Sequence, residues 1–373
     1  MTDLLRNLHN KKSQRYKTTS ILFLFIFLLS VIPLYSQQDN AVKPAEFSQI
    51  IDRISESGGF FYTDNWVSNE LTYLDVIETL ERYNVKGGVY IGVGPEQNYS
   101  YIHAIQPEKA FIVDIRHQNR MQHLVYKILM EKTDTRAEWC SKIFSMPLEN
   151  ADLPGNDANA QQIMRFLYGK RTVPEMMEKT VNTIYSELTN RYEFSLSRRD
   201  SLAITYIMRN FRFYNLNITY RGASVDWYPT FREIMLMKDM TGQYSNPFDS
   251  FEDFSYIREM HQQNRILPVT GDFGGTKALK ELAAYLKENN LTVSAFYLSN
   301  VEQYVFRDPR KWRRWVENVR ALPIDENSVF IRWTHDYGWQ GQTRLQKIKT
   351  FLENYDSGKY YNYDDLKRID YLK

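Results

Sequence analysis

The residues from Gly88 to Asn98 constrain the fold more than any other part of the chain. An apolar run over 88–93 continues directly into a turn that contains Gly94. This pattern predicts a buried strand followed by a tight turn. A second apolar run, 110–113, ends at Asp114, twenty residues after Gly94. Two buried strands joined by one short helix indicate a parallel unit with a right-handed crossover.

The rest of the chain extends this pattern with one long interruption. Further strands are predicted at 266–270, 293–298 and 329–332, and these too read as parallel strands. Between 133 and 262 the apolar spacing is mostly helical. Other helices are predicted over 45–56, from Ser68 onward, and over 99–106, 119–131, 278–289, 305–319 and 344–355. The predicted fold class is therefore α/β, with a Rossmann-like, mostly parallel sheet, flanking helices and a largely helical insertion.

These elements divide the 373 residues into five parts. The sheet is assembled from two segments on either side of the insertion, which we expect to form a cap or subdomain over one end of the sheet. The parts are an N-terminal targeting or anchoring segment (1–36), a linker and leading helix (37–57), the first sheet segment (58–132), the helical insertion (133–262), and the second sheet segment with a C-terminal helix (263–373).

The N-terminus carries an apolar run, 21–34, behind a basic stretch. Residues 1–17 hold five basic side chains against Asp3. A 14-residue helix spans roughly 21 Å, which is short against a hydrocarbon core of about 30 Å. With Ser36 next, this predicts a secretory signal peptide, although Leu34 and Tyr35 depart from the small residues usual at a cleavage site. An uncleaved membrane anchor is the alternative, and either case exports the globular part to the bacterial periplasm or surface.

Composition excludes several classes of site. The net charge of +2 is concentrated at the N-terminus, so no surface for tracking nucleic-acid phosphates is expected. Cys140 is the only cysteine, which rules out an intrachain disulfide; we expect a buried, unreactive side chain there, with a reactive thiol as the alternative. No histidine, cysteine and carboxylate set has zinc spacing, and His117 and His123 do not share a helix face, so no metal site is predicted.

Polar residues follow four of the predicted strands. Gly92 and Gly94 follow the first, Asp114 the second, Asp272 the third and Asn300 the fourth. The carboxyl ends of parallel strands meet at one edge of the sheet, where ligands bind. A glycine turn lets the backbone approach a ligand, and a carboxylate accepts bonds from ribose hydroxyls. Each feature also has an ordinary explanation, since glycines make tight turns and Asp114 could cap a helix.

These positions together resemble a class I S-adenosylmethionine-dependent methyltransferase domain over about 85–132 and 264–333. The resemblance implies a cofactor packed on the glycine turn, Asp114 on ribose, Asp272 on adenine and Asn300 near the methyl group. The corresponding cofactor-binding set is Gly92, Gly94, Asn98, Asp114 and Asp272. The turn into the last parallel strand at 322–331 also fits this family.

The sequence departs from the general methyltransferase pattern at three points. Gln97 replaces the third glycine of a dinucleotide fingerprint, which counts against a nicotinamide enzyme. Glu96 stands where methyltransferases often have a further glycine, and its charge would crowd a carboxylate-bearing cofactor. Asn300 lacks the Pro-Pro-Tyr that follows it in amino-group methylases.

More closely, the chain is similar to an uncharacterised bacterial family with a methyltransferase-like domain. The runs 64–70, 92–98 and 299–304 carry this likeness. Candidate catalytic residues are Asn300 and His335, which follows the last parallel strand and could act as a general base or simply hydrogen-bond within a loop.

Two functions therefore remain open. One is methyl transfer from S-adenosylmethionine to an unknown acceptor. The other is an exported or anchored protein that binds a protein or surface partner through the helical insertion, on a fold that has lost catalysis.

Overall fold

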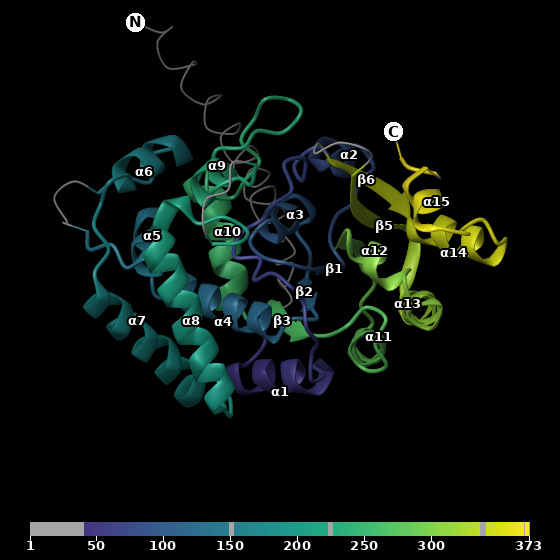
Figure 1. Ribbon diagram of the computed structural model, residues 1–373, viewed down its shortest axis with the longest axis horizontal. Helices are drawn as coiled ribbons and strands as arrows, with labels where there is room; N and C mark the ends of the chain where they lie inside the picture. Colours follow the sequence, from purple (N-terminus) through teal and green to yellow (C-terminus); the bar gives the residue numbers. More distant parts are fainter. Residues whose placement is uncertain (1–40, 149–152, 223–226, 336–340, 369, 373) are drawn as a thin grey trace, which may run out of the picture. The chain divides into compact units, whose positions relative to one another are not determined.

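A single six-stranded sheet forms the centre of the fold, with helices on both sides (Figure 1). The computed structural model describes residues 41–148, 153–222, 227–335, 341–368 and 370–372, and 41–373 form one compact unit. The strand order is β3-β2-β1-β4-β5-β6. The strands are β1 (Val89–Gly92), β2 (Lys109–Asp114), β3 (Ile266–Thr270), β4 (Val293–Ser299), β5 (Ile324–His335) and β6 (Gly341–Lys347).

Strands β1 to β5 are parallel, which confirms the predicted fold class. The chain moves outward from β1 through β2 to β3 and then returns to β4 on the other side of β1. Every residue of β1 and β3 is buried, as expected for strands covered by helices on both faces. The strand order consequently reverses between β1 and β4, at the position where Rossmann-like sheets bind ligands.

Strand β6 corrects one sequence prediction, which placed a helix over 344–355. Residues 341–347 instead pair antiparallel with β5, and the C-terminal helix begins only at Ile348. Thr343 and Leu345 are buried and alternate with more exposed neighbours, but Leu345 is the only large apolar residue of the strand. The period-two signal was therefore too polar to separate from the start of a helix.

The helices fall into two layers and a side group (Figure 1). One layer holds α2 (Ile77–Arg82), α3 (Asn98–Ile105), α4 (His117–Glu131) and α10 (Phe251–Gln262). The other holds α1 (Pro44–Ile54), α11 (Ala278–Glu288), α13 (Pro309–Ala321) and α14 (Ile348–Asp356). The side group is α5 (Arg136–Phe144), α6 (Ala160–Leu167), α7 (Pro174–Ser186), α8 (Arg198–Tyr214) and α9 (Phe231–Met235), and two short helices, α12 (Val301–Val305) and α15 (Tyr363–Arg368), complete the set.

The side group corresponds to most of the predicted insertion and packs beside α4, in teal in Figure 1. Its contact with α4 is aromatic, because the Tyr126 ring lies 5.6 Å from Trp139 and 6.0 Å from Phe211 between centroids. These rings belong to the same hydrophobic core as the sheet. The insertion therefore shares the core of the sheet and is not a separate compact unit.

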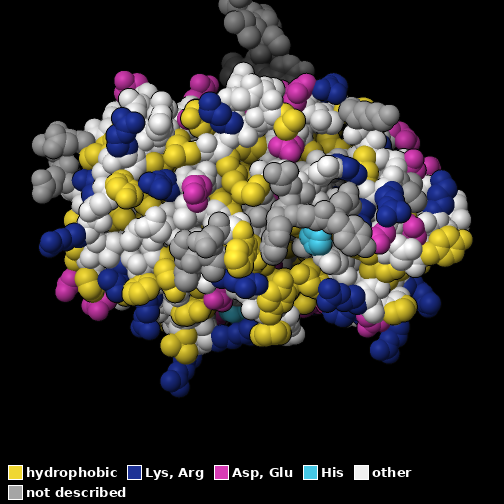
Figure 2. Space-filling view, turned by 45° about the horizontal axis from the view of Figure 1, so that its top comes forward, with side chains coloured by type: hydrophobic (Ala, Val, Ile, Leu, Met, Phe, Trp, Pro, Cys, Tyr) yellow, Lys and Arg dark blue, Asp and Glu magenta, His cyan; other side chains and the backbone are white. Residues whose placement is uncertain are grey.

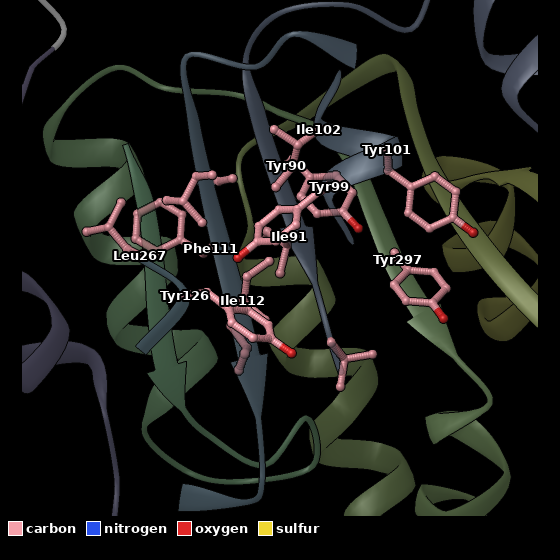
Figure 3. Close-up of a cluster of buried hydrophobic side chains, with 14 of the residues drawn as sticks. Tyr90, Ile91, Tyr99, Tyr101, Ile102, Phe111, Ile112, Tyr126, Leu267 and Tyr297 are labelled. Carbon is pink, nitrogen blue, oxygen red and sulfur yellow. The ribbon is translucent and has the colours of Figure 1, made fainter. Parts of the chain in front are cut away.

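Buried tyrosines bring polar atoms into the core beside β1 (Figure 3). The Tyr90 hydroxyl donates to Asn98 Oδ1 at 2.8 Å, and the Tyr101 hydroxyl donates to the Tyr73 carbonyl at 2.7 Å. Tyr297 on β4 donates to a carboxylate at the edge of the sheet. Each hydroxyl is satisfied, as burial requires, and the tyrosines thereby hold polar groups close to the carboxyl edge.

The helix predicted from Ser68 begins later in the structure, where α2 starts at Ile77. The Ser68 amide donates to Glu96 Oε1 at 3.0 Å, and the Glu70 amide donates to Ser68 Oγ at 3.2 Å. These side-chain bonds compete with helical hydrogen bonds. Leu71, which the helical pattern placed on the apolar face, is 49 % exposed.

Basic and acidic side chains are interspersed with hydrophobic ones on the face drawn in Figure 2. Within the described ranges, no helix is both long and apolar enough to span a bilayer. The predicted signal or anchor at 21–34 lies outside the described residues. Cys140 on α5 is buried, and burial raises the pKa of its thiol well above the usual range, as expected for an unreactive cysteine.

Candidate functional site

A cavity of about 280 Å³ lies at the carboxyl edge of the sheet. Residues that follow four different strands line it: Gly94 after β1, Asp114 at the end of β2, Asp272 after β3 and Asn300 after β4. The cavity therefore lies where the strand order reverses, the usual ligand position in open α/β sheets. Its volume is near the lower end of small-molecule clefts, roughly 300–1,000 Å³.

The turn after β1 is held together from inside by Asn98. Its Nδ2 donates to the carbonyls of Val93, Gly94 and Pro95 at 3.0, 3.2 and 2.7 Å. A Cβ at Gly92 would lie 2.0 Å from Asn98 Oδ1, so only glycine fits there. Gly94 has a φ of +83°, a conformation that favours glycine, and lines the cavity. Of the three predicted contacts in this turn, Gly94 faces the cavity, while Gly92 and Asn98 support the turn.

A buried histidine supports the turn from behind. His123 on α4 lies with Nε2 2.8 Å from the Gly94 carbonyl, and its Nδ1 lies 3.3 Å from the Tyr99 hydroxyl. Burial lowers the pKa of His123 to about 4, so the ring is neutral at physiological pH. A carbonyl only accepts, so the Nε2 atom carries the proton and Tyr99 donates to Nδ1. Sequence reasoning considered His123 only as a metal ligand and missed this role.

Asp114 is engaged by a neighbouring arginine. Arg116 donates from Nε to Oδ1 at 3.0 Å and from Nη2 to Oδ2 at 2.7 Å, and its backbone amide donates to Oδ1 at 2.8 Å. Both side chains are buried and both line the cavity. Oδ2 accepts one of these bonds, which leaves it capacity for a second donor such as a hydroxyl.

Asp272 is held in a comparable way but is more accessible. Lys311 Nζ donates to Oδ2 at 2.7 Å, and the Gly274 amide donates to Oδ1 at 2.9 Å. The Asp272 amide itself donates to Glu56 Oε1 at 2.6 Å, which ties this turn to the segment after α1. The Asp272 side chain is 22 % exposed, so a ligand in the cavity can reach it.

The two predicted catalytic residues are placed differently. Asn300 lines the cavity, and its amide contacts Gln303 Oε1 at a distance of 3.5 Å. His335 is exposed at the end of β5, where its ring packs edge-on to Trp333 with 5.6 Å between centroids. Trp333 lines the cavity and His335 does not. The structure thus brings Asn300 to the site and leaves His335 beside it.

Glu70 is a site residue that sequence reasoning missed. It lines the cavity, and its side chain accepts from the Tyr297 hydroxyl at 2.6 Å and from Ser299 Oγ. Gln97 Nε2 in turn contacts the Tyr297 hydroxyl at 3.3 Å. Burial raises the pKa of Glu70 to about 7, despite the two hydroxyl donors. A carboxyl that titrates near neutral pH in a cavity is a candidate general base.

Glu96 is placed away from the cavity, contrary to the expectation that its charge would crowd a cofactor. Its Oε1 accepts from the Ser68 amide, and its Oε2 is buried without a hydrogen-bond partner. Burial raises the pKa of Glu96 to about 7, so the side chain is largely protonated below that pH. It therefore presents no obstacle to an anionic ligand group in the cavity.

Fold and cavity together define an α/β protein with a Rossmann-like sheet and a small-molecule cavity at its switch point. Among the residues that the structure describes, no group of three or more histidine, cysteine or carboxylate side chains could hold a metal ion. The chain belongs to a family described as a domain of unknown function (DUF7790), which matches residues 65–194 and 215–367. The matched residues include all six strands and exclude the whole of α8. A comparison with curated proteins finds no match to the chain.

Proposed function

We propose that this protein binds S-adenosylmethionine in the cavity at the carboxyl edge and uses it for methyl transfer. The observation that carries the proposal is the convergence of Gly94, Asp114, Asp272 and Asn300 on one cavity. These residues come from four strand ends that are far apart in the sequence. Their meeting is what a cofactor with a ribose, a base and a reactive centre requires.

The residues present fit such a cofactor. Gly94 offers backbone without a side chain at the cavity wall, so a ligand can approach closely. Asp114 Oδ2 and the more exposed Asp272 each retain acceptor capacity, for ribose hydroxyls and for an exocyclic amine. Arg116 and Lys311 line the same cavity and balance the two aspartates, so a ligand with both signs of charge is accommodated.

When bound, S-adenosylmethionine supplies an electrophilic methyl group. The contribution of the chain is positioning, because methyl transfer needs the acceptor atom in line with that group. Asn300, which follows β4, and Glu70, which accepts from the adjacent Ser299, both line the cavity where an acceptor would meet the cofactor. Polar contacts made against the buried part of the wall are stronger than in bulk water, because charges are screened less there.

A second function, ligand or partner binding without catalysis, is favoured by one observation. Arg116 already makes three hydrogen bonds to Asp114, the carboxylate assigned to ribose. The predicted export of the globular part would also separate it from S-adenosylmethionine, which is made in the cytoplasm. On this proposal the helical insertion would provide the contact surface for a protein or surface partner.

Calorimetric titration separates these proposals. The purified full-length protein is titrated with S-adenosylmethionine, with its demethylated product, and with a nicotinamide dinucleotide as a control. We expect saturable binding of the first two and not of the third. Heat for none of them up to high micromolar concentration would refute cofactor binding and leave the second function.

A further inference from the structure

Aromatic side chains form the rim of the cavity. Phe61 packs against Tyr62 at 4.6 Å and against Tyr304 of α12 at 5.3 Å between ring centroids. The rings of Tyr220 and Tyr228, from the helical insertion, lie 5.3 Å apart and line the same cavity. The aromatic rim is therefore built from three segments that are distant in the sequence.

Part of this rim is exposed to solvent. Phe60 is 88 % exposed and Tyr62 is 59 % exposed, although both line the cavity. Exposed apolar side chains that gather in one place, as these do beside the cavity, mark ligand-binding grooves or interaction sites. Flat rings favour a flat partner, because stacked and edge-on arrangements add to the burial of apolar area.

The wall below the rim carries an uncompensated carboxyl, that of Glu70. Among the residues that the structure describes, the titratable groups that interact with it are tyrosines: Tyr297 on β4, Tyr90 on β1, Tyr101 on α3 and Tyr363 on α15. Ser299 and Tyr297 donate hydrogen bonds to Glu70, and no described lysine or arginine forms an ion pair with it. The ionised form therefore gains most from a further hydrogen-bond donor that enters from the cavity.

We propose that the acceptor substrate is a planar aromatic molecule with an ionisable hydroxyl group, a phenol, and that Glu70 takes its proton. The methylation step rests on the methyl transfer proposed above. The choice of a phenol rests on the aromatic rim and on Glu70. The ring stacks within the aromatic rim and directs its hydroxyl toward the carboxylate. Tyr297 and Ser299 act as positioning residues, because they fix both oxygens of Glu70.

The step balances without another reactant. The phenol oxygen forms a bond to the methyl carbon, and the carbon–sulfur bond breaks with its electron pair remaining on sulfur, which becomes neutral. The hydroxyl proton passes to the ionised Glu70 carboxylate and then to water. General-base assistance of this kind contributes typically about 10²–10⁴-fold in rate.

Binding of 4-methylphenol, with toluene as the matched compound lacking a hydroxyl, tests the ligand class without any cofactor. Both are titrated by NMR into the full-length protein between pH 6 and pH 8.5. We expect 4-methylphenol affinity to rise about 5–20-fold as Glu70 ionises, since bonds to charged groups are stronger than neutral ones. Toluene affinity should not rise. Equal pH behaviour of the two compounds, or no binding of either at low millimolar concentration, overturns the proposal.

The Glu70→Gln variant keeps the size of the side chain and removes its charge. We expect this variant to abolish the pH dependence of 4-methylphenol binding, while Glu81→Gln, at an exposed position of α2, leaves that dependence unchanged. If Glu70→Gln does not fold, Tyr297→Phe serves instead. Loss of its hydrogen bond raises the pKa of Glu70 and moves the binding profile to higher pH. A profile that neither variant moves overturns the role of Glu70.

Turnover with S-adenosylmethionine separates failure of this inference from failure of the proposed function. If the demethylated product binds wild type and Glu70→Gln within twofold, we expect 4-methylphenol methylation to fall by about 10²-fold or more in the variant. Equal turnover in the two proteins, or no methylation of bound 4-methylphenol by wild type, overturns the inference alone. Absence of product binding refutes the proposed function, whatever the phenol does.

The rim is tested by Phe60→Ala, with Tyr361→Ala as a control at an exposed aromatic outside the cavity. We expect Phe60→Ala to weaken binding of 4-methylphenol by about 3–10-fold, which is the range of one aromatic contact. Unfolding temperatures of both variants should match wild type. Equal affinities in the two variants would remove Phe60 from the site.

Discussion

Two buried carboxylate side chains, Glu131 and Glu70, have different partners: Glu131 on the helical side is paired with cations, whereas Glu70 at the sheet edge is bonded to hydroxyl groups. On α4, the Glu131 side chain is 3 % exposed, and its carboxylate lies 3.0 Å from Lys127 Nζ, 3.1 Å from Arg191 Nη1 and 2.5 Å from the Tyr192 hydroxyl. At the sheet edge, the Glu70 side chain is equally buried, but its hydrogen-bond partners among the described residues are two hydroxyl groups.

The environment of each carboxylate follows from its neighbours. Lys127 also donates to Asn264 Oδ1 at 2.5 Å, and burial lowers its pKa to about 8 although Glu131 opposes this. The cluster joins α4, the insertion and the turn before β3, so its charges are paired for structure. Glu70 has no cationic partner among the described residues, lines a cavity and has a pKa raised to about 7, which is a costly arrangement for stability alone. This difference is what we expect if the sheet edge is the functional region, as we propose.

The largest expected effect comes from breaking the paired cluster. Glu131→Gln leaves the Lys127 charge buried without its carboxylate, which should lower the free energy of unfolding by about 3–5 kcal/mol. Urea denaturation at pH 7 measures it, with Glu81→Gln as the exposed control, expected within about 0.5 kcal/mol of wild type. A loss below about 1 kcal/mol for Glu131→Gln would contradict the structural role of the pair.

Glu70→Gln, in contrast, should become more stable relative to wild type as pH rises. The pKa of Glu70 is about 7 in the folded protein, above the ordinary value of 4.5, so the folded state holds the proton longer. Glu70 contributes its full stabilisation below pH 4.5. As pH rises to about 7, the free energy of unfolding decreases by about 3 kcal/mol at most because of this group. The stability of Glu70→Gln relative to wild type should therefore increase over this window in urea denaturation. A constant difference would mean that Glu70 ionises normally.

His123 should give a pH dependence of opposite sign. Its pKa is lowered to about 4, so between pH 6.5 and 4 the unfolded chain binds a proton that the folded protein does not. Stability should fall as pH falls through this window, by up to about 3 kcal/mol for this group. His123→Gln keeps a donor for the Gly94 carbonyl and should remove that dependence. Thermal unfolding of the two proteins at pH 4.5 and pH 7 measures it, and parallel curves would contradict the assignment.

The smallest expected effect on stability comes from Gly94→Ala and Gly87→Ala, and comparing the two distinguishes a strained turn from a lost ligand contact. Gly94 and Gly87 both have positive φ, +83° and +68°, but a Cβ at Gly94 would lie 2.9 Å from Gln97 and one at Gly87 would meet nothing within 4 Å. Each alanine variant should lose about 1 kcal/mol. Only Gly94→Ala should also weaken binding of the demethylated cofactor in calorimetry. Equal affinities in the two variants would remove the turn from the site.

Local sequence pattern predicted the strands β1 to β5 and their parallel direction, because buried runs and glycine turns carry a strong signal. It also brought Gly94, Asp114, Asp272 and Asn300 to one edge, since parallel strands end together. Strand β6 was missed because its residues are mostly polar, and it is fixed by pairing with β5.

The positions of the other site residues depend on tertiary contacts, which the sequence pattern does not reveal. Glu70 is 227 residues from Tyr297, and no spacing rule connects two groups so far apart. Arg116 was likewise not foreseen as the partner of Asp114, although it is two residues away, because the direction of a loop side chain depends on the fold. His335 follows a strand as a site residue should, but β5 extends to it and its side chain lies outside the cavity.

The most direct test of the central claim is calorimetric titration of the demethylated cofactor into three forms of the full-length protein. These are wild type, Asp272→Asn and Asp356→Ala, the last at an exposed ion pair with Arg320. Asp272 is the better probe than Asp114, because its partner Lys311 is partly exposed and the variant should fold. We predict micromolar or tighter binding to wild type and Asp356→Ala, weakened about tenfold in Asp272→Asn, as expected for loss of one hydrogen bond to a charged group. Equal binding to all three forms, or binding to none, would contradict a cofactor site at the carboxyl edge of the sheet.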